Sequence, residues 1–299
     1  SDAASSLLED RGLASASPLP GLSELPMDSM TVATGGGGSA GAAVLGAVAK
    51  PNLTPYKPLD WSGKIVVSNV PGTHTDTTAL AYTDTLYVDW AAINKGTAAT
   101  NAVFYIELYV DGSLRETWYQ NPSLNANTYT AVSDFSIGQL SAGKHKIQIK
   151  LDTTKAVAES NESDNTYTKT ITVTNPNLKA YKPTGWSGSI VVSNVTGTYT
   201  NSSTLASNET LYVDWAGING GKVPVATGFN IEMLVDGTVR ETWYQAPSLN
   251  ANTYTFVSDF SIGQLSAGKH TIQIRLDSGG SVLETSEKDN AYTKTITVK

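Results

Sequence analysis

Two acidic turns hold the residues of this sequence that are best suited to binding a metal ion. The turns read VAESNESDNTY and VLETSEKDNAY, and an aspartate precedes each. Calcium takes six to eight hard oxygen ligands, which carboxylates supply. Because Asn and Asp side chains also bind the amides of their own turns, we expect a structural role, with calcium as the alternative and no other cofactor. The calcium candidates are Asp152, Glu159, Glu162, Asp164, Asp277, Glu284, Glu287 and Asp289.

Two adjacent pairs of aromatic residues are candidates for a binding surface. Trp118 and Tyr119 form the first pair, and Trp243 and Tyr244 form the second. Side chains alternate between the two faces of a strand, so one ring of each pair is expected to point outward. Such a ring can stack on a glycan or pack on another subunit. The alternative is a core tryptophan beside an ordinary surface tyrosine.

The sequence carries no constellation of residues that indicates catalysis. It has no cysteine, and His74, His145 and His270 are its three histidines. No Gly-x-Ser-x-Gly or His-Glu-x-x-His motif accompanies them. His145 and His270 each follow Ala-Gly-Lys at the start of an expected strand, where a structural hydrogen bond is the simplest role. We therefore predict that the protein is not an enzyme.

An internal repeat organises most of the chain. Residues 116–152 recur as residues 241–277, an offset of 125, and only four of these 37 positions differ. We predict a tail over residues 1–50, a first domain over 51–175 and a second over 176–299. The four differences are Asn121/Ala246, Ala131/Phe256, Lys146/Thr271 and Lys150/Arg275.

Apolar residues in each repeat alternate with the period of half-buried strands. Leu86, Val88 and Trp90 share one face of the segment LYVDWAAIN, and similar patterns fill FYIELYV and KHKIQIKLD. About seven such segments per repeat, separated by Gly, Asn and Asp turns, predict an all-β fold of two tandem immunoglobulin-like β-sandwich domains, with a barrel as the alternative. We expect Trp61 and Trp186 to cover the ends of the sandwiches.

These motifs resemble those of the CARDB family, the cell-adhesion-related domain found in bacteria. The resemblance rests on the opening PNL, the strand LYVDWA.IN, the L.AG.H.I.I.LD segment and the closing turn V-x-E-(S/T)-x-E-x-D-N-x-Y of both repeats. It implies immunoglobulin-like modules of exported prokaryotic proteins with adhesion or spacer roles. It implies no catalytic residues, and the tail has no counterpart in the pattern.

Composition limits the partners and the location. The net charge of −7 argues against a nucleic-acid partner, because phosphates need a basic face. No apolar run reaches the 18 or so residues that a membrane helix needs. The chain begins without methionine, and we expect an exported prokaryotic protein, extracellular or at the cell surface, from which a signal peptide has been removed.

The tail suggests how the protein assembles. It contains four consecutive glycines and cannot build a core of its own, but it includes two slim apolar segments. Open sheet edges accept added strands, so we expect the tail to link copies of the protein into an extracellular filament or surface assembly. For the tail, the alternative is that it lies on its own first domain. For the protein, the alternatives are a cell-adhesion or glycan-binding module, which binds a surface glycan or protein, and a non-catalytic fragment of a larger exported hydrolase. The assembly candidates are Met30, Val32, Val44, Leu45 and Val48.

Overall fold

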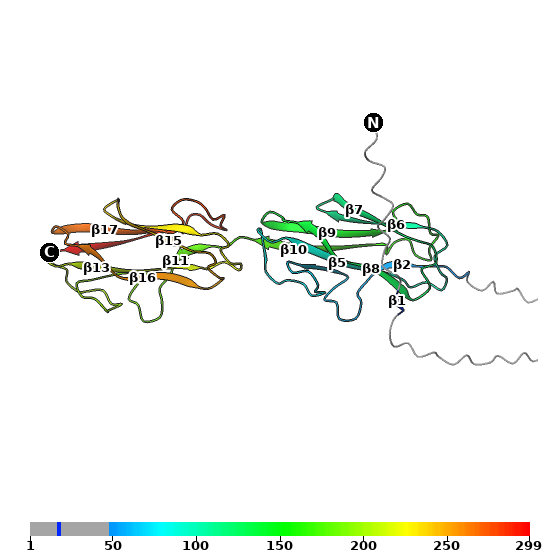
Figure 1. Ribbon diagram of the computed structural model, residues 1–299, viewed down its shortest axis with the longest axis horizontal. Helices are drawn as coiled ribbons and strands as arrows, with labels where there is room; N and C mark the ends of the chain where they lie inside the picture. The colour runs from blue at the N-terminus through cyan, green and yellow to red at the C-terminus, as the bar shows by residue number, and fades with distance from the viewer. Residues whose placement is uncertain (1–16, 19–47) are drawn as a thin grey trace, which may run out of the picture. The chain divides into compact units, whose positions relative to one another are not determined.

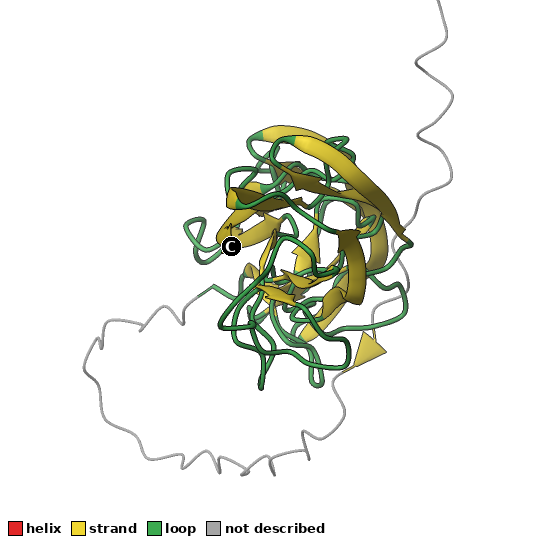
Figure 2. Ribbon diagram, turned by 90° about the vertical axis from the view of Figure 1, so that its left-hand side faces the viewer, coloured by secondary structure: helices red, strands yellow, loops and turns green. Residues whose placement is uncertain are grey.

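The structure is a computed structural model that describes residues 17–18 and 48–299. The chain divides into two compact units. We name the two repeats domain 1, residues 51–175, and domain 2, residues 176–299. Figure 1 shows strands throughout both, and Figure 2 shows strands and loops but no helix among the described residues. The all-β prediction is confirmed.

Domain 1 consists of two sheets. One has the order β1-β8-β5-β2, with β3 also paired to β5, and the other has the order β4-β10-β9-β6-β7. Strands β2 and β3 pair with successive parts of β5, and β4 pairs with β10 in parallel. The bounds are β1 Ser17–Pro18, β2 Leu53–Tyr56, β3 Ile65–Ser68, β4 Leu80–Ala81, β5 Leu86–Asn94, β6 Phe104–Val110, β7 Ser113–Gln120, β8 Thr128–Gly138, β9 Gly143–Leu151 and β10 Thr166–Thr174.

Domain 2 repeats this arrangement. Strands β11, β12 and β16 all pair with β13 in one sheet, and the other sheet has the order β15-β14-β17-β18. The bounds are β11 Leu178–Ala180, β12 Ile190–Ser193, β13 Leu211–Asn219, β14 Phe229–Val235, β15 Thr238–Gln245, β16 Tyr254–Gly263, β17 Gly268–Arg275 and β18 Ala291–Val298.

The alternating residues of facing strands form the core of each domain. Leu86, Val88 and Trp90 are buried, as the alternation predicts, and so are their partners on β6 and β9. In domain 2 the cluster contains Ile190, Val192 and Trp215 together with residues of β14 and β17. Burial of apolar area on both inner faces is the main stabilising contribution to such a sandwich.

Tryptophans of the loops after β2 and β11 cover a different surface from the one predicted. Trp186 packs on Val191 and Ala216. Val191 lies between the core residues Ile190 and Val192, so it points away from the core. Trp61 packs in the same way on Val66 and Ala91. These rings therefore cover the outer face of a sheet and not the end of the sandwich, because small residues on the central strand leave room there.

Candidate functional sites

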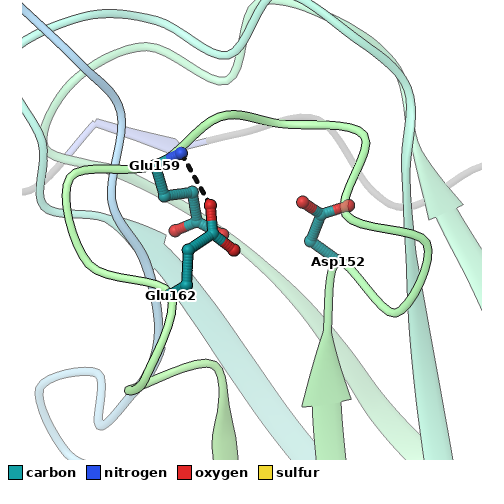
Figure 3. A group of neighbouring side chains, drawn as sticks. All are labelled: Asp152, Glu159 and Glu162. Atoms are coloured by element: carbon teal, nitrogen blue, oxygen red, sulfur yellow. Dashed lines mark hydrogen bonds between the residues drawn. The ribbon is translucent and has the colours of Figure 1, made fainter.

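The predicted acidic turns form a closed corner in each domain. Carboxylate oxygens of Asp152, Glu159 and Glu162 lie within 4.8 Å of one another (Figure 3). Domain 2 brings Asp277, Glu284 and Glu287 together in the same way. The fourth predicted member does not join them, since Asp164 instead accepts a hydrogen bond of 3.1 Å from Asn52 Nδ2, and Asp289 accepts one of 2.9 Å from Asn177 Nδ2.

Hydrogen bonds to these carboxylates hold the corner together. Asp152 accepts bonds of 2.9 Å from the amides of Ala156 and Val157. Glu159 accepts bonds from the amide of Leu53 and, at 2.6 Å, from Asn165 Nδ2. The first ties the turn after β9 to strand β2. The acidic residues therefore have a structural role: Asp152 binds amides of its own turn, as the turn chemistry predicts, whereas Glu159 joins segments that are distant in sequence.

Burial makes the central carboxyl of each corner hard to ionise. It raises the pKa of Glu159 to about 7, and the nearby charges of Glu162 and Asp152 act in the same direction. Burial raises the pKa of Glu284 to about 7 for the same reason. Near neutral pH each corner is therefore poised between two protonation states, and a cation would favour the ionised one.

The donor set of the corner fits a hard divalent cation. Asn165 is buried, and its Oδ1 has no hydrogen-bond partner. It lines a shallow cavity of about 370 Å³ together with Asp152 and Glu162. Carboxylate oxygens are calcium ligands, so Asp152, Glu159 and Glu162 would hold the ion. Asn165 turns its Nδ2 toward Glu159 and would supply its oxygen only after its amide turned over. Lys150 and Lys155 line the same cavity and oppose it electrostatically.

The two predicted aromatic pairs place one ring inside and one outside. Trp118 lies 5.2 Å from Trp90 and is buried, and Trp243 lies 5.3 Å from Trp215. Tyr119 is half-buried, whereas Tyr244 is 67% exposed. The tryptophans thus belong to the space between the sheets. Tyr244 remains as a single exposed ring on β15.

A larger aromatic surface, which sequence reasoning missed, lies on the outer face of domain 2. The Trp186 ring stacks on Tyr199 at 4.7 Å and meets Phe256 edge-on at 6.2 Å. Tyr254 lies 5.9 Å from Phe256 and 4.8 Å from Tyr181. We name these five residues the aromatic face. The sequence feature that could have predicted the aromatic face is the Ala131/Phe256 difference, which puts a large apolar residue on an otherwise repeated strand.

The matching histidines make the structural hydrogen bonds that their position predicts. His145 Nδ1 lies 2.7 Å from Asp111 Oδ2, and His270 Nδ1 lies 2.6 Å from Asp236 Oδ2. Each aspartate belongs to a two-residue Asp-Gly turn with positive φ at both positions. The hydrogen bond to His145 holds the pKa of Asp111 below its usual range.

The described part of the tail pairs with a sheet edge in domain 1. Strand β1 is antiparallel to β8, with Ser17 opposite Tyr129 and Pro18 opposite Thr128. Of the residues that the sequence singled out for assembly, Val48 is 81% exposed. Met30, Val32, Val44 and Leu45 lie outside the described residues.

Comparison with known proteins gives the chain a family. The CARDB family model matches residues 66–169 and 190–294. The chain therefore belongs to the CARDB family, as two tandem domains. CARDB domains are non-catalytic, surface-associated modules of the immunoglobulin-like type. A search of curated proteins finds no match. In the described residues no helix is long and apolar enough to cross a membrane.

Several solved structures resemble the chain at low sequence identity. The CARDB domain of the PF1109 protein from Pyrococcus furiosus, described in complex with di-metal ions, is 17% identical over 43% of this chain and 97% of its own, with a TM-score of 0.33. A domain of a putative cell surface protein from Methanosarcina acetivorans is 22% identical over 42% and 93%, with a TM-score of 0.31. The fibronectin(III)-like modules of CbhA from Clostridium thermocellum are 14% identical over 71% and 85%, with a TM-score of 0.21.

Proposed function

We propose that the protein is an extracellular, non-enzymatic structural subunit whose N-terminal segment joins it to other copies in a filament or surface assembly. The observation that carries this proposal is the pairing of Ser17–Pro18 with the edge of β8. A segment far from the sandwich in sequence supplies a strand to it, which is the physical basis of strand addition. Membership in a family of surface-associated, non-catalytic modules supports the extracellular role.

The geometry of β1 suits a donor strand. A sheet edge presents a row of N–H and C=O groups that a further strand can satisfy. Proline cannot donate to a ladder and is therefore tolerated on edge strands, where Pro18 lies. A donor that pairs with its own chain can also pair with another copy. Such head-to-tail contacts generate rings or open filaments.

Electron microscopy of the full chain tests this proposal. We expect the full chain to form filaments or regular assemblies and a chain that begins at Lys50 to remain single. Ser17→Pro removes the one N–H that β1 can offer and should also prevent assembly. Ser23→Pro lies outside the paired positions and serves as the matched control. If the full chain and the shortened chain both remain single at high concentration, the assembly proposal fails and a binding module becomes the better interpretation.

A further inference from the structure

The edge of β16 in domain 2 shares its sequence, and its register with the neighbouring strand, with the edge that receives β1 in domain 1. The segment SLNANTYT occurs at residues 123–130 and again at 248–255. Tyr129 pairs across to Ile93 of β5, and Tyr254 pairs in the same register to Ile218 of β13. An acceptor site that depends on this backbone therefore exists twice in each chain, whereas the Ser17–Pro18 segment occurs once.

The outward backbone groups of this edge are available in domain 2. The carbonyl of Thr253 accepts a hydrogen bond of 3.0 Å from the amide of Asn219, so it faces β13. Backbone groups alternate in direction along an antiparallel strand, and those of Tyr254 therefore face away from β13. No strand pairs with this edge in the described part of domain 2. Tyr254 is 43% exposed, whereas Tyr129, opposite Ser17, is half-buried.

Domain 2 has an exposed apolar surface beside this edge, formed by the rings of Phe256 and Tyr254, which we call the apolar ledge. Phe256 replaces Ala131 two residues after the tyrosine and is 50% exposed. Its ring lies against the buried Trp186 and beside Tyr254. The five residues of the aromatic face carry no charge, and the tail sequence from Ala14 to Leu22 carries none either. A neutral segment can therefore approach this ledge without burying an unpaired charge.

From this juxtaposition we propose that the edge of β16, with Tyr254 and Phe256, binds the Ser17–Pro18 segment of a second copy of the protein. The inference rests on the proposed function and names its acceptor site. It is continuous with the β1–β8 pairing, because the two acceptor edges share their sequence and their register. Within one chain the segment pairs with its own β8, and between chains it pairs with the β16 edge of the next copy.

The exposed rings of Tyr254 and Phe256 determine which of the two acceptor edges, that of β8 or that of β16, binds the segment. Pairing within the chain has the advantage of tethering, which for a flexible linker corresponds to an effective concentration of the order of millimolar. The edge of β16 must therefore bind the segment more tightly than that of β8, and the exposed Phe256 and Tyr254 rings are the groups that differ in exposure. Truncating an aromatic anchor of this kind weakens binding by about tenfold to a hundredfold. Assembly should accordingly depend on protein concentration and on Phe256.

Disulfide trapping between full-length copies tests the acceptor, because the protein contains no cysteine of its own. Under mild oxidation, a Pro18→Cys chain is mixed with a Thr253→Cys chain, which keeps Tyr254 in place. In the matched control it is mixed with a chain that carries Thr128→Cys, the position opposite Pro18 in domain 1. We expect dimers between different chains to form at least about fivefold faster with Thr253→Cys. Adding Phe256→Ala should abolish this preference, and adding Ala131→Phe to the Thr128→Cys chain should create one.

The outcomes separate this inference from the proposed function. Equal trapping at positions 128 and 253, or trapping no faster than with Leu283→Cys at another exposed site, overturns the acceptor assignment. If the full chain still assembles in the electron microscope, the proposed function survives that result and the acceptor lies elsewhere. If the full chain never assembles, both fail. A loss of polysaccharide binding in Phe256→Ala without any trapping would assign the aromatic face to a glycan and also overturn the inference.

Discussion

Domains 1 and 2 share their interior but differ on the sheet face outside it. Both have the paired tryptophans, the His–Asp contact and the acidic corner. Outside, Trp61 stacks on His74 at 4.6 Å in domain 1, where Trp186 stacks on Tyr199 in domain 2. The difference teaches that the repeated residues maintain the sandwich, whereas the substitutions gather where a partner could be contacted.

The largest loss of unfolding free energy is expected from replacing a buried asparagine that makes the same hydrogen bonds in both domains. Asn94 is fully buried, and it accepts hydrogen bonds from the amides of Asn52 and Gly96 and donates to the carbonyls of Ala98 and Leu124, all between 2.8 and 3.0 Å. Asn94→Ala removes all four bonds and leaves three of these backbone groups without a partner, since the carbonyl of Leu124 keeps a bond from the amide of Thr100. It should lower the unfolding free energy of domain 1 by about 3 kcal/mol or more. Urea unfolding monitored by tryptophan fluorescence measures this loss.

The equivalent substitution in domain 2 tests whether the two buried asparagines contribute equally to stability. Asn219 makes the same four contacts, with Asn177, Gly221, Val223 and Leu249. Asn219→Ala should therefore cost domain 2 a similar free energy. A clearly smaller loss in one domain would mean that the two interiors are not equivalent after all.

The sequence predicted the fold because its main determinants are local and periodic. Alternation assigned Leu86, Val88 and Trp90 to the core, and the Asp-Gly pair at 111–112 marked a two-residue turn. The acidic corner could be predicted in part, since two of its three acidic residues, Glu159 and Glu162, lie in one turn and Asp152 shortly precedes it. The bond from Glu159 to the amide of Leu53 spans 106 residues, and no local pattern indicates it.

The aromatic face and the role of Asn94 escaped prediction for a related reason. The residues of the aromatic face come from three separate segments, and only the packing of strands beside one another brings them together: Tyr181 and Trp186 from the connection after β11, Tyr199 from the loop after β12, and Phe256 from β16. Asn94 ends a strand whose alternation marks it as one more inward position. Its hydrogen bonds reach loops whose paths the sequence does not specify.

The next largest effect is the pH dependence that the acidic corners create. The pKa of Glu159 and of Glu284 is about 7 in the folded protein, above the ordinary value of 4.5. The folded state therefore holds protons that the unfolded chain releases, and stability falls as the pH rises from about 4.5 to 7. After allowance for solvent screening, we expect a loss of about 1 to 2 kcal/mol for each corner. Thermal unfolding in the presence of a chelator measures it.

The double variant Glu159→Gln, Glu284→Gln isolates this effect and should flatten the slope between pH 4.5 and 7. Asp76 and Asp111 have lowered pKa values, so they affect stability only below that pH range. Their contribution to the unfolding free energy is present above about pH 3.8 and is lost as the pH falls through the folded pKa. His270 has a raised pKa and adds a loss near the upper end, which the double variant retains. A slope unchanged in the double variant would show that the corners are not its source.

Calcium should distinguish the two corners. Lys155 lines the corner of domain 1, whereas Gly280 occupies that position in domain 2. The acidic turn of domain 2 gains a cation elsewhere, since Lys288 replaces Ser163 as an exposed residue of the turn. Because Lys155 lines the cavity itself, we expect its absence to weigh more, and domain 2 should bind calcium more tightly, with a dissociation constant of about 10⁻³ M, typical of weak extracellular sites. At 10 mM calcium its unfolding free energy should rise by about 1 kcal/mol. Calorimetry with calcium and with magnesium measures the rise.

Lys155→Gly is the variant that tests this interpretation, because it removes from the cavity of domain 1 the lysine that domain 2 lacks. The backbone of Lys155 has φ 55°, a left-handed conformation that glycine adopts readily, so the change introduces no strain. The variant should bring the calcium response of domain 1 up to that of domain 2. No response in either domain, with or without the substitution, would leave the corners as purely hydrogen-bonded structures.

The smallest effect concerns two different ways of holding the loop that carries Trp61 or Trp186. In domain 1, Lys169 Nζ lies 2.5 Å from Asp76 Oδ1, and Asp76 also accepts a hydrogen bond of 2.8 Å from the amide of Val67. In domain 2, Asn201 takes the place of the aspartate and accepts the equivalent bond from Val192 at 2.9 Å. The lysine at the matching position, Lys294, has a pKa lowered by burial.

Exchanging these residues tests whether the charge or only the hydrogen bond matters. Asp76→Asn should cost domain 1 about 0.5 to 1 kcal/mol, because it keeps the bond to Val67 but removes the ion pair. Asn201→Asp should raise the pKa of Lys294 and stabilise domain 2 by a similar amount, and 1 M NaCl should diminish both effects. Unfolding at low and high salt, with lysine titration by NMR, measures them. If Asn201→Asp destabilises domain 2, the cost of burying the added carboxylate exceeds the attraction to Lys294, and the asparagine is then the better partner for a half-buried lysine.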